Sequence, residues 1–191
     1  MKPLLLFTLL WTCLLNPAAA ESSLSRQQQQ LLALTGIMAQ KMSLIEPAMI
    51  IAQVWAESSA RPDAVSPKNA IGLLQLTQIA VLDRGFSVED FQRCQEPMVN
   101  LFIGLTFLNY LFNRYQHVLL ALAAFNAGPE RVDRWLKEQR FSRQPLGVSF
   151  INDIPFMETR RYLRRIVTSS IALKQCNGTA QYCLNRVFAD G

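Results

Sequence analysis

The chain has 191 residues, of which 50% are hydrophobic and 17% are charged, and its formal net charge is +5. This length and apolar content fit a single domain with a sizeable core, and the composition marks no linker or internal repeat. The basic excess is mild and forms no long runs. It therefore suits an anionic surface as partner and argues against a nucleic-acid-binding protein.

The first twenty residues form a pattern typical of a secretory signal peptide. Lys2 precedes an apolar run from Leu4 to Leu15, and the small residues Ala18 to Ala20 follow. This run is shorter than the roughly 20 residues that cross a bilayer, so a cleaved signal is preferred to a membrane anchor. Lipid modification of Cys13 is not expected, because bulky residues precede it.

Cleavage after Ala20 leaves residues 21–191 as one exported, periplasmic domain without a transmembrane segment. The removed part contains Lys2 and no acidic residue, so the net charge falls from +5 to +4. The glutamines 27–30 are expected in an exposed first helix.

A helix expected from Pro47 to about Ser58 carries an acid on an apolar face. Glu57 lies seven residues after Ile50 and three after Val54, so helical spacing places its carboxyl among core side chains. Burial and the nearby helix C-terminus both raise the pKa of such a carboxyl, which suits a proton donor at neutral pH. The alternative is a glutamate that reaches solvent or is neutralised by Arg61.

The remaining elements are also predicted to be helical. Residues 61–72 are rich in turn formers and predict an irregular segment. A core helix follows from apolar residues at spacings of three and four, namely Met98, Leu101, Leu105, Leu108, Phe112 and Tyr115. Residues 119–125 are apolar on every side, as in a buried helix, and Gly128-Pro129 ends it. A short amphipathic helix then carries Val132, Trp135 and Leu136.

Three cysteines lie beyond the signal peptide. Cys176 and Cys183 flank the turn former Asn177-Gly178, so export to an oxidising compartment predicts a disulfide between them. Cys94 is left over and is expected to be buried, with a reactive thiol as the alternative. The lone His117 and the scattered cysteines have no metal-ligand spacing, and they assemble no nucleophile with a base.

Four motifs stand in order between residues 57 and 162. They are Glu57-Ser58-Ser59 with Ala64-Val65-Ser66; Gly72-Leu73-Leu74-Gln75; Phe125-Asn126-Ala127-Gly128; and Glu158-Thr159-Arg160-Arg161-Tyr162. Together they resemble the signatures of the soluble lytic transglycosylases. Leu74 replaces the usual methionine and Phe125 the usual tyrosine. Asn100 and Gly104 also match a helix of this family.

The resemblance implies a lysozyme-like fold, mainly α within an α+β superfamily, with the turn-rich segment lining a cleft. It implies cleavage of the β-1,4 bond between N-acetylmuramic acid and N-acetylglucosamine in peptidoglycan glycan strands, with no metal and no cofactor. Glu57 would protonate the glycosidic oxygen and then take a proton from the C6 hydroxyl of muramic acid, which closes a 1,6-anhydro ring. The core motifs would occupy 44–167, leaving 168–191 as a tail.

The same match implies roles for residues around Glu57. Tyr162 would place its hydroxyl on Glu57 and orient it; the alternative is a core tyrosine with a satisfied hydroxyl. Phe125 would keep an aromatic platform for the sugar but lose the hydrogen bond of the family tyrosine.

Three polar residues are expected to bind the saccharide, namely Ser66, Gln75 and Asn126. Their alternative roles are to cap or line a turn, or to cap a helix end. Glu158 and Arg160 are expected to be structural, as an ion pair or as support for the start of a helix.

Two other functions remain open. A muramidase would hydrolyse the same bond with water held by a second carboxylate, and Asp63, Asp83 and Asp90 are available but lie in no recognisable motif. A non-catalytic component of an envelope-spanning machine would use the fold to grip glycan, although the intact Glu57 argues against it. By analogy with small exported members of the family, components of a conjugation, secretion or pilus apparatus are candidate partners.

Overall fold

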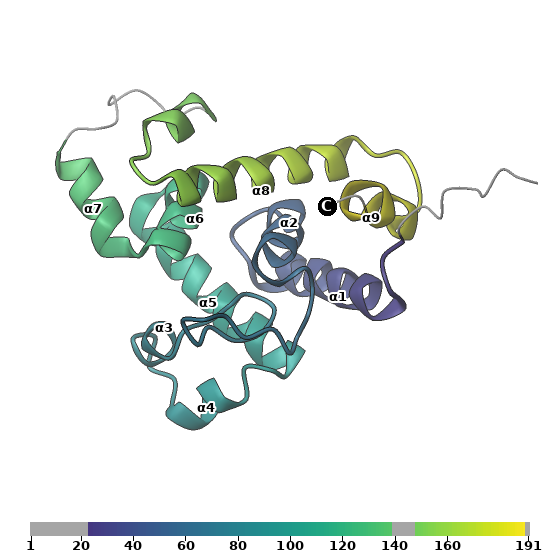
Figure 1. Ribbon diagram of the computed structural model, residues 1–191, viewed down its shortest axis with the longest axis horizontal. Helices are drawn as coiled ribbons and strands as arrows, with labels where there is room; N and C mark the ends of the chain where they lie inside the picture. Colours follow the sequence, from purple (N-terminus) through teal and green to yellow (C-terminus); the bar gives the residue numbers. More distant parts are fainter. Residues whose placement is uncertain (1–22, 139–147, 190–191) are drawn as a thin grey trace, which may run out of the picture.

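The computed structural model describes residues 23–138 and 148–189, and this part of the chain is mainly helical (Figure 1). In chain order the helices are α1 (Arg26–Met42), α2 (Pro47–Ser58), α3 (Gln78–Leu82), α4 (Val88–Gln92), α5 (Pro97–Tyr115), α6 (Val118–Ala127), α7 (Pro129–Lys137), the 3-10 helix η1 (Val148–Asp153), α8 (Met157–Gln175) and α9 (Ala180–Phe188). The prediction of a mainly α fold is confirmed. None of the described helices is both long and apolar enough to cross a membrane.

Helix α2 is the central element of the fold. It lies between α1 and α8 in Figure 1, and it packs against both. Its apolar sequence explains this position, because Ile50, Ala52, Val54 and Trp55 are all buried. The helix begins with Pro47 at its first turn and ends in a left-handed residue, Ser59, so its bounds match the prediction.

Helices α5 and α6 pack against each other and complete the core. Residues 119–124 of α6 are buried on all sides, as their continuous apolar sequence predicts. The apolar stripe of α5 is buried at Leu101, Leu105 and Leu108, but Met98 is 54% exposed because it lies in the first turn, at the helix end. In α7, Val132 and Trp135 are buried, whereas Leu136 is 37% exposed on the helix side turned to solvent.

The turn-rich segment between α2 and α3 is fastened from both sides. Ser58 at the end of α2 donates a hydrogen bond of 2.9 Å to the backbone oxygen of Leu73. From α5, Asn100 accepts from the backbone N–H of Leu74 at 2.8 Å and donates to the backbone oxygens of Ile71 and Cys94 at 2.9 and 2.8 Å. These bonds replace the strand pairing that the segment lacks apart from the isolated bridges at Ile71.

Two glycines permit this close approach. Gly72 has a φ of +79°, and a Cβ there would lie 2.2 Å from the backbone oxygen of Cys94. On α5, a Cβ at Gly104 would lie 2.3 Å from Cδ1 of Leu74. The asparagine and glycine of α5, matched by the family pattern, therefore hold and accommodate the same loop.

The C-terminal helix is tied back onto the core. Cys176 and Cys183 form the predicted disulfide, which joins the end of α8 to α9. The ring of Phe188 on α9 then packs on Trp55 of α2, with centroids 4.9 Å apart. Cys94 is free and buried, and burial raises the pKa of its thiol to about 11, so it is the inert thiol expected from the sequence.

Replacing Asn100 tests how much the fold depends on these bonds. Asn100→Ala leaves the N–H of Leu74 and the carbonyl of Cys94 without these partners, so we expect a loss of roughly 2 to 4 kcal/mol in the free energy of unfolding. Urea denaturation provides the measurement. Asn113→Ala, at an exposed position of the same helix, is the matched control and should change stability by less than about 0.5 kcal/mol. Equal effects would contradict the fastening role.

Candidate active site

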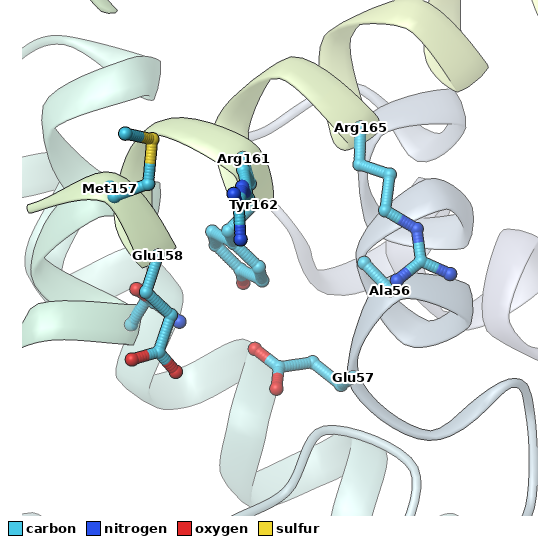
Figure 2. Close-up of a pocket in the computed structure, with 8 residues that line it drawn as sticks. Ala56, Glu57, Met157, Glu158, Arg161, Tyr162 and Arg165 are labelled. Atoms are coloured by element: carbon cyan, nitrogen blue, oxygen red, sulfur yellow. The ribbon is translucent and has the colours of Figure 1, made fainter.

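Three helices meet around a cavity of about 550 Å³ (Figure 2). The end of α2 contributes Ala56 and Glu57, and the end of α6 contributes Asn126. The first half of α8 contributes the rest of the lining, namely Met157, Glu158, Arg161, Tyr162 and Arg165. The structure thus brings together three residues that the sequence predicts as site residues: Glu57, Tyr162 and Asn126.

The carboxyl of Glu57 is held in an environment that favours its protonated form. Burial raises its pKa from 4.5 to about 7; the nearby Tyr162 hydroxyl offsets part of this effect, and the charge of Glu158 adds to it. Arg61 does not neutralise Glu57, because its guanidinium donates to the backbone oxygen of Ser58 instead. Glu57 remains partly exposed to the cavity, so a buried proton donor stays accessible from outside.

Tyr162 faces Glu57 from α8. Figure 2 shows its hydroxyl directed toward the Glu57 carboxyl. The side chain is buried, and within the described part of the chain its hydroxyl makes no hydrogen bond that satisfies the distance and angle criteria. Its pKa lies well above the usual 10 because of burial and the charge of Glu57. The phenol is therefore a neutral group beside the acid.

Asn126 lines the cavity and is held by a residue of α8. Its Oδ1 accepts a hydrogen bond of 2.8 Å from the hydroxyl of Thr159, which is 2% exposed. This bond fixes the amide and leaves Nδ2 as a donor. Thr159 belongs to the fourth motif, but the sequence predicts no role for it, because a threonine in a helix does not indicate which distant residue it contacts.

The other predicted substrate-binding residues lie outside the cavity lining. The Ser66 hydroxyl accepts from the backbone N–H groups of Lys68 and Ala70, and Gln75 donates to the backbone oxygens of Ala64 and Gly72. Both arrangements stabilise the turn-rich segment. Phe125 is half-buried and packs on Phe107, with ring centroids 5.3 Å apart.

Sequence reasoning missed three charged residues of the cavity. Glu158, Arg161 and Arg165 line it together with Tyr162. Their spacings of three and four residues place them on one face of α8, and this periodicity was a usable signal. Glu158 was expected to be structural, but Figure 2 shows its carboxyl pointing toward the same space as that of Glu57. Arg160, by contrast, supports η1 by donating to the backbone oxygen of Asn152.

The aspartates considered for a hydrolytic water lie elsewhere. Asp63 and Asp83 do not line the cavity, and Asp90 caps α4 through hydrogen bonds from Ser87 that lower its pKa. Within residues 23–138 and 148–189, no group of three or more His, Cys, Asp or Glu residues could hold a metal ion.

Comparison with known proteins identifies the family. A family model described as the transglycosylase SLT domain matches residues 35–145, more than half of the chain. The chain belongs to this family. As an SLT domain it is 34% identical to the soluble lytic murein transglycosylase of Salmonella typhimurium over 126 residues, which make up 63% of this chain and 19% of that relative. It thus spans about a fifth of the length of the curated relatives it matches.

Solved structures support the same fold for this SLT domain. The 70-kDa soluble lytic transglycosylase of Escherichia coli matches 74% of this chain and 23% of its own, at a TM-score of 0.61 and 26% identity. An inactive glutamate-to-glutamine mutant of the lytic transglycosylase Slt from Pseudomonas aeruginosa matches 73% of this chain and 23% of its own, at a TM-score of 0.62 and 29% identity. The predicted lysozyme-like fold of this family is confirmed.

The raised pKa of Glu57 has a consequence for stability. Between about pH 4.5 and 7 the folded SLT domain keeps a proton that the unfolded chain releases, so its stability should fall with rising pH across this range and level off above it. Glu57→Gln removes this dependence. We expect the variant to gain up to roughly 3 kcal/mol over the wild type between pH 4.5 and 8, measured by urea denaturation. Parallel stability curves would contradict the buried acid.

Proposed function

We propose that this chain is a lytic transglycosylase that cleaves peptidoglycan glycan strands between N-acetylmuramic acid and N-acetylglucosamine. The observation that carries the proposal is the Glu57 carboxyl, which keeps its proton to about pH 7 at the wall of an open cavity and faces the Tyr162 hydroxyl. Membership of the SLT family and the lytic transglycosylase names of its relatives support it.

In the proposed reaction Glu57 acts twice. It first gives its proton to the oxygen that joins the two sugars, and the bond from this oxygen to C1 of muramic acid breaks. The C6 hydroxyl of the same muramic acid then attacks C1 and returns its proton to the Glu57 carboxylate. The product carries a 1,6-anhydro ring, the enzyme regains its proton, and no water is consumed. A pKa near 7 suits a group that must both give and accept a proton.

The neighbouring residues take supporting roles in this proposal. Tyr162 orients the Glu57 carboxyl with a neutral hydroxyl, which does not force the acid to ionise. Asn126 offers Nδ2 to a sugar oxygen or acetamido group. Ser66, Gln75 and Phe125 are proposed to meet the glycan beyond the cavity, along the turn-rich segment and the end of α6.

Hydrolysis is the second candidate, and Glu158 favours it. A muramidase needs another carboxylate to hold water, and Glu158 lines the same cavity as Glu57. However, Glu158 belongs to the Glu-Thr-Arg-x-Tyr motif of the transglycosylase pattern, so its presence there is also expected for the first candidate. The two reactions differ in their products, because hydrolysis leaves reducing ends instead of anhydro ends.

The cellular setting is proposed from the sequence pattern. We propose that residues 1–20 are a signal peptide, that residues 21–191 form one domain, and that this domain acts in the periplasm. The signal segment and residues 190–191 lie outside the described residues. A role in local opening of the wall for a conjugation, secretion or pilus apparatus is a further part of the proposal, as is the alternative of a glycan-gripping component without activity.

Replacement of Glu57 tests the proposal directly. Glu57→Gln nearly conserves volume but removes the transferable proton, so we expect the variant to fold and to release no anhydro-muropeptides from purified peptidoglycan, as measured by mass spectrometry. Glu130→Gln, an exposed glutamate on α7, is the matched control and should remain active. Hydrolysed products from the wild type would favour a muramidase, and equal activity of Glu57→Gln would favour the non-catalytic role.

Tyr162→Phe tests the orientation of the acid. The change removes only the hydroxyl that faces Glu57, so the fold and glycan binding should be nearly unchanged. We expect turnover to fall by roughly 10- to 100-fold, which corresponds to about 1.4 to 2.7 kcal/mol of transition-state stabilisation. Tyr182→Phe on α9, at a tyrosine that is 51% exposed, is the control. Unchanged turnover in Tyr162→Phe would show that Tyr162 only packs.

A further inference from the structure

Gln53 is a buried polar residue that the mechanism above does not use. It lies on α2 and is 0% exposed. Neither Nε2 nor Oε1 of its amide has a hydrogen-bond partner in the described part of the chain. Such a group is unusual, because burying an amide without hydrogen-bond partners destabilises a protein.

The position of Gln53 connects it to the acid. It precedes Glu57 by four residues, so the two side chains lie on the same face of α2, one helical turn apart. Tyr162 on α8 packs against this face, and its hydroxyl is also without a partner among the described residues. The amide of Gln53 lies close enough to this hydroxyl to lower the pKa of Tyr162, against the raising effects of burial and Glu57.

An amide at this position is not needed for packing. The neighbouring buried residues of α2 include Ile50, Ala52 and Val54, and an aliphatic side chain at 53 would satisfy the core at lower cost. Three unpartnered polar atoms, two of Gln53 and one of Tyr162, instead gather behind Glu57. An amide also differs from most side chains in offering both a donor and an acceptor.

We propose that Gln53 positions the Tyr162 hydroxyl and lets it follow both protonation states of Glu57. When Glu57 is a carboxylate, the Tyr162 hydroxyl donates a hydrogen bond to it and accepts one from Nε2 of Gln53. When Glu57 holds a proton that no substrate oxygen has yet taken, Tyr162 accepts from the carboxyl and donates to Oε1 of Gln53. No proton is lost or gained by Tyr162 or Gln53; only the direction of the hydrogen bonds reverses.

This inference rests on the proposed function, because the reversal is needed only if one carboxyl gives and later accepts a proton. The charged and titratable groups that share the cavity with Glu57 are Glu158, Arg161, Tyr162 and Arg165, all from α8, while α6 adds the neutral Asn126. The position behind the Tyr162 hydroxyl is occupied by Gln53. None of the other side chains of the cavity supplies both a donor and an acceptor there.

Gln53→Met is the main test, since it keeps the length of the side chain and removes both hydrogen-bonding atoms. We expect turnover on purified peptidoglycan to fall by about 3- to 10-fold, the scale of one net hydrogen bond. The carboxyl limb of the pH profile should move to higher pH, because the Tyr162 hydrogen bond to the charged carboxylate is stronger than the one to the neutral carboxyl, so losing its support costs the carboxylate more. The melting temperature should change little, because loss of the hydrogen bond to Tyr162 is offset by burying an apolar side chain in place of an amide. Thr35→Val, at another fully buried polar residue, is the control with an unchanged pH profile.

A double-mutant cycle locates the effect. In a Tyr162→Phe background, Gln53→Met should change turnover by less than about 2-fold, because the hydroxyl that transmits its effect is absent. Equal losses in both backgrounds would overturn the proposal, as would wild-type turnover and pH profile in Gln53→Met. Gln53→Leu provides a second apolar variant with the same expectations in case Gln53→Met does not fold.

The Glu57 carboxyl can also be titrated by NMR of carbon-13-labelled protein, without any substrate. Gln53→Met should raise the pKa of Glu57 in this measurement, and an unchanged value would contradict the proposal. The titration separates the two ideas. Failure of the wild type to cleave peptidoglycan refutes the proposed function, whereas the NMR result still decides whether Gln53 acts on Glu57 through Tyr162.

Discussion

The structure depends on keeping one carboxyl out of bulk water while leaving it open to a cavity. Glu57 stands at the last turn of an apolar helix, where burial and the helix dipole both oppose its negative charge. A carboxyl on an isolated helix would simply turn to solvent. Here α8 packs against α2, and the Glu57 side chain lies beside Tyr162 at the cavity.

Much of the remaining fold holds this crossing of α2 and α8 in place. On one side, Ser58 and Asn100 fasten the segment that leaves α2, so the end of the helix cannot fray. On the other, the disulfide returns α9 to the core, where Phe188 packs on Trp55. These contacts lie outside the cavity and still determine how precisely its polar groups meet.

Local features were predictable from the sequence, and pairings between distant segments were not. Apolar spacing located α2 and the face that carries Glu57, because helical periodicity needs no tertiary information. The pairing of Glu57 with Tyr162 came only from the family pattern. Nothing in the residue types could tell that the amide of Gln75 bonds its own loop while that of Asn126 reaches the cavity. Gln53 was not predicted as a site residue, because the helix that carries it was predicted from its apolar residues.

The contact between Gly104 and Leu74 links two positions in their evolution. Any side chain at position 104 would collide with Leu74. A larger residue at 104 therefore requires a smaller or more flexible side chain at 74. The same substitution can therefore be harmful in one sequence background and neutral in another. A substitution at position 104 therefore becomes acceptable only after position 74 has changed, so the two positions cannot vary independently.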